Sequence, residues 1–238
     1  MWFDAQRNLV IYDTPRAEEI AASVPDAVRL HNGYVAAPAT LYNLQLLRYL
    51  GFPTIRPMDV SYDWPGRYVP FEAQRTTANF LSVHPRAFVL NDMGTGKTLA
   101  ALWAGDFIMR SNVGLRCLVV APLSTLERVW ADAIFQNFLG RRKVVVLHGS
   151  AAKRRELLNS EADFYVVNYD GVEVLAKELA ERPDIRMCII DEASAYRNRT
   201  TERHRLARRL LASKDYLWLM TGTPTPNDAC DGDTGNNQ

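Results

Sequence analysis

The chain has 238 residues, of which 47% are hydrophobic and 23% charged, and its formal net charge is +1. This is the composition of a soluble globular protein with one good-sized core and a smaller module. No run approaches the roughly 20 apolar residues of a membrane helix, and the N-terminus lacks a signal-peptide layout, so we expect a cytoplasmic, intracellular protein with no membrane partner. The cysteines lack metal-ligand spacing, and we expect small buried side chains at Cys117, Cys188 and Cys230.

The N-terminal part of the chain predicts a small α/β module. Its apolar patterns predict strands at 8–12, 27–30 and 33–37 and helices at 15–23 and 40–50. Residues 51–70 carry four prolines and two glycines, which is typical of a linker. We therefore assign 1–62 to an accessory module with its Pro-rich linker. No catalytic pattern is visible there, and both a docking role and a structural cap remain open.

The segment 87–98 joins a short apolar strand, a glycine-containing turn and the start of a helix, which is the local geometry that cradles phosphates. Gly94 and Gly96 allow successive N–H groups to point inward, and Lys97 supplies positive charge to the terminal phosphates. Thr98 is a candidate ligand of Mg²⁺. Asn91 replaces the usual first glycine, and asparagine tolerates left-handed backbone. A nucleotide phosphate site is therefore favoured over an ordinary glycine turn.

After this loop, continuous apolar runs alternate with helical segments. The runs lie at 117–121, 144–147, 164–168, 187–190 and 216–220. Because they are continuous, they predict strands buried on both faces, as in a parallel sheet covered by helices. The expected fold is α/β and doubly wound, with ligands at the carboxyl ends of the strands.

Two adjacent acids follow the run at 187–190. Asp191 at the strand terminus is the candidate second ligand of Mg²⁺, and Glu192 is the candidate base that orients and deprotonates the attacking water. The alternative is a solvated pair of loop acids. The four apolar residues that precede the pair place it on a sheet edge and favour the catalytic interpretation.

A basic segment follows, with six arginines between positions 197 and 209. Such density can bind a phosphate backbone. The alternative is a solvated helix face opposite an apolar stripe of leucines. We give Arg197 and Asn198, which lie nearest the acid pair, a preference for function and expect the later arginines to be solvated surface.

Together these motifs resemble the first RecA-like lobe of a superfamily 2 helicase, most like the Swi/Snf-type DNA-dependent ATPases and their phage relatives. The likeness covers about residues 63–227 and implies a RecA-like P-loop domain with a mostly parallel sheet. Its motifs I, Ia, Ib, II and III correspond to 92–98, 120–124, Asn168 with Tyr169, 191–194 and 221–227. In motif II, Ser194 replaces the histidine of many relatives.

The resemblance implies roles that spacing alone does not. Gln74, at the start of a helix predicted over 72–83, lies where the family contacts adenine. The implied nucleotide-binding set is Gln74, Asp92, Met93, Gly94, Thr95, Gly96, Lys97 and Thr98. The implied DNA contacts are Ser124, Asn168 and Tyr169, and the implied coupling residues are Thr221 and Thr223. The cofactors implied are ATP and Mg²⁺, and the partner is single- or double-stranded DNA.

Members of this family continue into a second RecA-like lobe that carries an arginine finger. No such lobe is visible after residue 227, and 228–238 lacks an apolar pattern, so we expect a disordered tail or a truncation there. The function expected is the ATP-binding lobe of a DNA helicase or translocase, slow in hydrolysis as this chain alone. Two alternatives remain open: a non-catalytic half-motor that binds DNA or a partner, and a small P-loop kinase.

Overall fold

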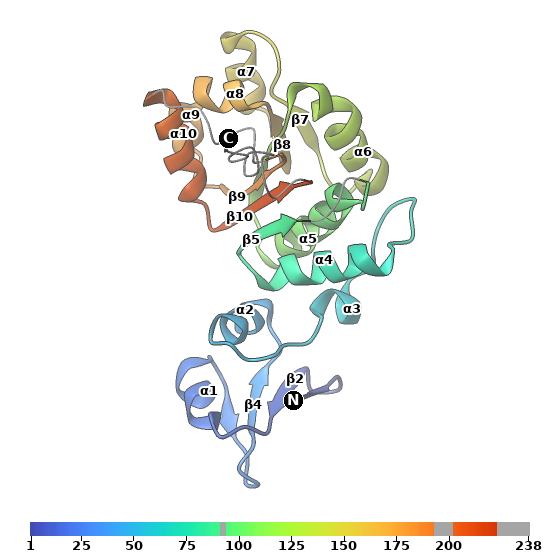
Figure 1. Cartoon of the computed structure of the whole chain (residues 1–238), viewed down its shortest axis with the longest axis vertical. Coiled ribbons are helices and arrows are strands. Elements are labelled where there is room, and N and C mark those ends of the chain that lie inside the picture. Colours follow the sequence, from blue (N-terminus) through green and yellow to red (C-terminus); the bar gives the residue numbers. More distant parts are fainter. Residues whose placement is uncertain (91–93, 193–201, 223–238) are drawn as a thin grey trace, which may run out of the picture.

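A computed structural model of the chain describes residues 1–90, 94–192 and 202–222. It contains two sheets, an antiparallel one near the N-terminus and a six-stranded parallel one (Figure 1). Five residues of the predicted site lie outside the described residues, and these are Asp92, Met93, Arg197, Asn198 and Thr223.

The N-terminal module is built on a four-stranded antiparallel sheet. The strand order is β1-β2-β4-β3, formed by β1 (Trp2–Asp4), β2 (Leu9–Tyr12), β4 (Val35–Pro38) and β3 (Val28–Arg29). The helices α1 (Ala17–Ser23) and α2 (Leu41–Tyr49) pack on this sheet through Ile20, Leu44 and Leu47, which are almost fully buried. The hydroxyl of Thr40 accepts a hydrogen bond from the Asn43 amide and so caps α2. The strands and helices predicted for this module are confirmed, with small shifts at their ends.

The segment after the module contains a helix that its sequence pattern did not predict. Residues 51–70 were expected to form a linker, but α3 (Pro57–Ser61) lies within them. Proline is favoured in the first turn of a helix, because its missing N–H has no partner there in any case. Met58 is fully buried in the core of the large domain, and its amide donates to Asn79 Oδ1 at 2.9 Å. Burial of Met58 therefore stabilises a helix in a segment whose prolines and glycines predicted a linker.

The large domain is organised around six parallel strands in the order β5-β10-β9-β6-β8-β7. These strands are β5 (Arg86–Leu90), β10 (Tyr216–Thr221), β9 (Ile185–Ile190), β6 (Arg116–Val120), β8 (Phe164–Val167) and β7 (Val144–Val146). Side chains of the central strands pack into two hydrophobic cores, one on each face of the sheet. Cys117 of β6 lies in one core, and Cys188 of β9 lies in the other. Both thiols are buried, as predicted, and burial raises the pKa of Cys188 to about 12. Cys230, for which burial was also predicted, lies outside the described residues. The predicted doubly wound parallel sheet is confirmed.

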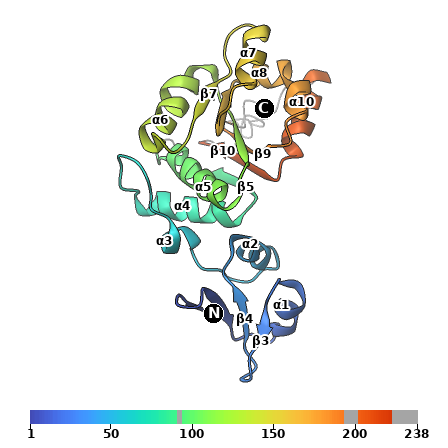
Figure 2. The same ribbon diagram turned by 180° about the vertical axis from the view of Figure 1, so that it is seen from behind.

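Helices cover both faces of this sheet (Figures 1 and 2). One face carries α3, α4 (Glu72–Val83), α5 (Lys97–Ser111), η2 (Leu126–Ala131) and α6 (Asp132–Phe138). The other carries α7 (Ala151–Leu158), α8 (Tyr169–Val174), α9 (Ala176–Ala180) and α10 (Glu202–Ala212). Among the described helices, none is both long and apolar enough to cross a membrane.

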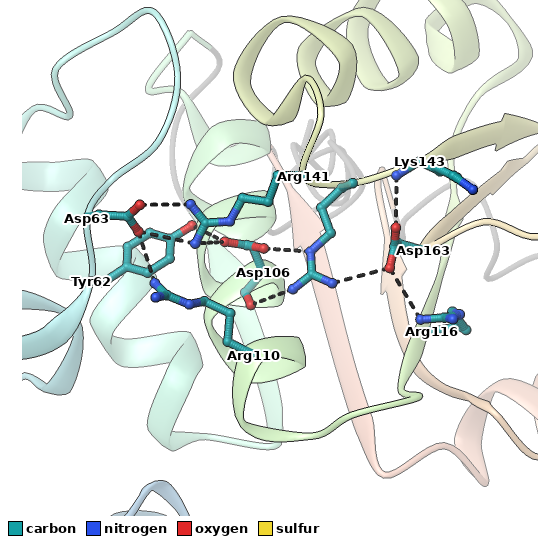
Figure 3. Close-up of polar contacts among 9 residues, drawn as sticks. Tyr62, Asp63, Asp106, Arg110, Arg116, Arg141, Lys143 and Asp163 are labelled. Atoms are coloured by element: carbon teal, nitrogen blue, oxygen red, sulfur yellow. Dashed lines mark hydrogen bonds and ion pairs between the residues drawn. The ribbon is translucent and has the colours of Figure 1, made fainter.

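A buried ionic network fixes α5 at the amino-terminal edge of the sheet (Figure 3). Asp106 of α5 is fully buried, and its carboxylate accepts hydrogen bonds from Tyr62 Oη at 2.8 Å and Arg142 Nε at 2.6 Å. Arg141 Nη2 lies 3.0 Å from the same carboxylate. Arg142 continues to Asp163, just before β8. Every charge in this network has a partner, which is the condition for tolerating charges in an interior. The opposite, amino-terminal end of α5 lies at the glycine loop.

The module contacts the large domain through α2. Gln45 Nε2 donates to the carbonyl oxygen of Ser82 at 2.8 Å, and Arg48 Nε donates to His84 Nε2 at 3.2 Å. Both acceptors lie at the end of α4, directly before β5. The module is therefore attached at the amino-terminal edge of the sheet, away from the loop at 94–98.

Candidate functional site

The glycine loop has the backbone conformation that a phosphate site needs. Gly94 and Gly96 adopt φ values of +80° and +75°, in the left-handed region that favours glycine. Gly96 is the N-cap residue of α5, and because it has no side chain, no side-chain hydrogen bond caps this helix. A helix N-terminus with inward amides and an adjacent lysine attracts anions. The local structure predicted around Lys97 and Thr98 is therefore present.

Gln74 lies against this loop although it belongs to α4. Its Oε1 accepts a hydrogen bond from the Phe71 amide at 3.0 Å, and its Nε2 lies 3.4 Å from the carbonyl oxygen of Gly96. Gln74 is 6% exposed, so it is not a solvated surface residue of α4. A Cβ atom added at Gly96 would lie only 2.0 Å from Gln74 Nε2. Gly96 thus permits the close approach of the two segments.

The acid pair lies at the carboxyl end of β9, between β10 and β6. Glu192 has φ of +50°, in the left-handed region that is uncommon for a residue with a side chain. Its amide donates to Asp191 Oδ1 at 3.1 Å. The hydroxyl of Tyr169 contacts the carbonyl oxygens of both acids, at 3.0 Å for Glu192. The pair is therefore held in one backbone conformation by contacts from its own turn and from α8.

Trp130 is the partner of Asp191 that sequence reasoning missed. Its indole Nε1 donates to Asp191 Oδ2 at 3.0 Å, and its ring is fully buried. Burial raises the pKa of Asp191 above its usual value, while the hydrogen bonds from Trp130 and the Glu192 amide and the charge of Lys97 oppose that rise. The loop and the acid pair both lie at the carboxyl edge of the parallel sheet, the loop after β5 and the pair after β9.

The predicted DNA-contact residues follow other strands at the same edge of the sheet. Ser124 lies exposed in η1 (Leu123–Thr125), after β6. It lines a surface hollow of about 190 Å³ together with Arg128 and His148, two residues that sequence reasoning did not single out. Asn168, by contrast, is buried and accepts a hydrogen bond from Arg154 at 2.7 Å. Ser124 is therefore available to a macromolecular ligand, whereas the Asn168 side chain is held inside the fold.

Thr221 ends β10 and is 7% exposed, which places it at the carboxyl edge beside β9. In the described part of the basic segment, Arg205, Arg208 and Arg209 are exposed on α10. Ala207 on the same helix is fully buried in the core. The prediction that the later arginines are solvated surface is confirmed for these three.

The residues gathered here fit a nucleotide with Mg²⁺. Hydroxyl and carboxylate oxygens are the protein ligands that Mg²⁺ prefers, and Thr98 and Asp191 supply them at one edge of the sheet. The amides at the start of α5 and the ammonium group of Lys97 match the negative charge of phosphates. The donor set thus agrees with the predicted ligands.

Comparison with known proteins supports this interpretation. The family model described as "SNF2-related domain" matches residues 74–232. The ATP-dependent helicase fft3 of Schizosaccharomyces pombe is 33% identical over 146 residues, which are 58% of this chain and 15% of that protein. A putative protein p41 of Acyrthosiphon pisum secondary endosymbiont phage 1 is 31% identical over 172 residues, 69% of this chain and 37% of that protein. The chain thus spans only a minor part of either relative.

A solved structure shares the fold. The SWI2/SNF2 ATPase core of Sulfolobus solfataricus, in complex with double-stranded DNA, superposes with a TM-score of 0.57 at 23% sequence identity. The match covers 69% of this chain and 34% of that one. The RecA-like architecture expected for the large domain is therefore confirmed.

Proposed function

Because the chain belongs to the family of SNF2-related domains, we propose that it is the ATP-binding lobe of a DNA helicase or translocase. The observation that carries this proposal is one site at the carboxyl edge of the parallel sheet. The loop with Gly96 and Lys97 lies at that edge after β5, and the acid pair lies there after β9. The charge of Lys97 opposes the rise of the Asp191 pKa. A P-loop lysine and a carboxylate at a strand end recur together in the active sites of P-loop enzymes that hydrolyse ATP.

The chemistry follows from the residues in place. The amides at the start of α5 and Lys97 bind the terminal phosphates, and Gln74 contacts the adenine base. Thr98 and Asp191 would hold Mg²⁺, which neutralises charge on the phosphates when bound. Glu192 accepts a proton from the water that attacks the γ-phosphate, and the contact of Tyr169 with its carbonyl oxygen keeps its backbone fixed.

DNA binds at the same edge of the sheet in this proposal. The support is the exposed Ser124 beside Arg128 and His148, which offer hydrogen bonds and positive charge to a phosphate backbone. The related archaeal ATPase core was solved with double-stranded DNA. Thr221, on the strand beside the acid pair, couples the nucleotide state to movement of the lobe. The protein thus works inside the cell on DNA, in single- or double-stranded form.

Rapid hydrolysis requires an arginine from a second RecA-like lobe, which contributes on the order of 10³ to 10⁵ in rate in phosphoryl-transfer enzymes. The 238-residue chain alone therefore binds ATP with Mg²⁺ but turns it over very slowly. The non-catalytic half-motor differs from this proposal in having no turnover in any assembly.

The test is ATP turnover with and without double-stranded DNA, by this chain and by a fusion that appends a second RecA-like lobe from a relative. We expect DNA-stimulated turnover only in the fusion, and its loss in the same fusion with Glu192→Gln. DNA binding without turnover in every form would favour the half-motor. Phosphate transfer from ATP to a nucleoside acceptor would instead support the kinase.

A further inference from the structure

The buried indole of Trp130 donates a hydrogen bond to Asp191, the proposed metal ligand, and the proposed function gives this bond no role. We propose that Trp130 is a positioning residue, whose N–H fixes the carboxylate of Asp191 in the orientation that binds Mg²⁺. This inference rests on the proposed function, because it presumes that Asp191 is a metal ligand. In this proposal η2, which lies between η1 and α6 in the chain, contributes to the nucleotide site.

The choice of partner distinguishes Trp130 from the other fully buried tryptophans. A buried indole N–H needs an acceptor, and Trp103 and Trp218 find theirs in the backbone carbonyl oxygens of Pro65 and His84, at 2.9 and 3.0 Å. Trp130 instead donates to a side-chain carboxylate, Asp191, at 3.0 Å. A carbonyl acceptor serves only the fold, whereas a carboxylate acceptor constrains a group that also acts on a ligand.

The local backbone of Trp130 is unusual. Residues Leu126–Ala131 form a π-helical turn, directly before the regular helix α6. π-helical turns are rare, and they occur frequently at functional sites because they alter the direction of side chains within a helix. Trp130 lies in this turn, and its ring is fully buried in the core of the α5 face. The surrounding core therefore holds the indole firmly.

The two oxygens of Asp191 are held by different donors. Oδ2 accepts from Trp130, and Oδ1 accepts from the Glu192 amide at 3.1 Å. Each carboxylate oxygen has two lone pairs, so one hydrogen bond to each leaves capacity for a metal ion. Donors that orient a metal ligand typically contribute 10- to 100-fold to metal affinity. Removal of the indole N–H frees the carboxylate to rotate about one remaining contact.

The first test compares Trp130→Phe with a matched control, Trp218→Phe. Both replacements remove an indole from a fully buried position, but only the first removes a donor to Asp191. We would titrate Mg²⁺ into each chain with a fluorescent ADP analogue and also measure binding of the analogue without metal. We expect Trp130→Phe to raise the Mg²⁺ concentration needed for half-maximal binding 10- to 100-fold. Metal-free binding, and both quantities in Trp218→Phe, stay within about twofold of the parent chain.

The second test needs neither turnover nor a folded Trp130→Phe variant. The ¹⁵N-labelled, metal-free chain gives one indole N–H signal for each of its five tryptophans, assignable by through-bond correlations. We expect Asp191→Asn to shift the Trp130 signal and to leave those of Trp103 and Trp218 in place. An unmoved Trp130 signal would overturn the inference.

The outcomes separate the inference from the function on which it rests. Absence of Mg²⁺-dependent nucleotide binding in the parent chain would contradict the proposed function itself. Equal Mg²⁺ dependence in the parent chain and in folded Trp130→Phe would overturn only the role of Trp130.

Discussion

The side-chain Nε2 of Gln74 lies 3.4 Å from the carbonyl oxygen of Gly96, so α4 contacts the N-cap residue of α5. This contact is possible because Gly96 has no Cβ atom, and because the left-handed conformation at φ +75° suits glycine. The geometry of the loop therefore depends on a residue that lies outside the loop in sequence.

Gly96→Ala tests this contact. A left-handed alanine costs about 1–2 kcal/mol, and its Cβ atom would also displace Gln74. We expect at least tenfold weaker nucleotide binding, measured with a fluorescent ADP analogue. Gly33→Ala is the control, because Gly33 has φ of +84° and open space around it, so it measures backbone strain alone. If Gly96→Ala weakens nucleotide binding as much in a Gln74→Ala background as in the parent chain, the two residues are not coupled.

Asp106→Ala tests the buried ionic network. This substitution leaves the Arg142 guanidinium, which is only 13% exposed, without its nearest carboxylate. Breaking a buried pair by removal of one partner destabilises proteins by about 3–5 kcal/mol, and we expect that loss in urea unfolding. Asp63→Ala removes a carboxylate that is 58% exposed and contacts Arg110 and Arg141, and we expect a loss of about 1 kcal/mol or less. Equal losses in the two variants would contradict a central role for Asp106.

The contact between the module and the large domain is predicted to weaken in acid. Burial lowers the pKa of His84, and the nearby Arg48 guanidinium acts in the same direction. Its Nε2 accepts a hydrogen bond from Arg48 Nε, which requires a neutral ring. Because the unfolded chain takes up this proton near pH 6.5, the contribution of His84 to stability is complete above that pH. It is lost as the pH falls through the lower pKa of the folded state.

Thermal unfolding between pH 5 and 8 measures this effect. We expect His84→Gln to flatten the pH dependence of the melting temperature below pH 6.5. His31→Gln is the control, because His31 is exposed and lies far from α4 in sequence. An unchanged pH dependence in His84→Gln would show that another group titrates.

Glu192→Gln separates binding from chemistry. Replacement of the carboxylate by an amide keeps the size of the side chain but removes the proposed base. General base catalysis contributes about 10²- to 10⁴-fold to the reaction rate. In the two-lobed fusion with DNA, we expect turnover to fall by at least 10²-fold while the affinity for ATP with Mg²⁺ changes less than threefold. A comparable loss in binding would assign Glu192 to the ligand rather than to the water.

The sequence predicted the structure correctly where residues adjacent in the chain determine the local conformation. Gly94, Gly96 and Lys97 after an apolar strand predicted the loop, and the continuous apolar runs predicted the parallel sheet. The acid pair was found because it follows such a run. In each case the residues that carry the signal are adjacent in the chain.

The residues that were missed depend on distant contacts. Trp130 lies 61 positions from Asp191, and nothing around it in the sequence indicates that its indole meets a carboxylate. The helix α3 was mistaken for linker because its stability comes from burial of Met58, not from its prolines. The burial of Asn168, set by Arg154 of α7, was likewise invisible, since tertiary contacts decide which side chains of a strand end stay exposed.

In the proposed function, the loop at 94–98 and the acid pair together bind ATP with Mg²⁺. The most direct measurement is calorimetric titration of the chain with ATP and Mg²⁺, beside Lys97→Ala of confirmed fold. We expect saturable binding at one site per chain, at least tenfold weaker in Lys97→Ala. Equal affinity in both proteins, or no binding to the parent chain, would contradict it.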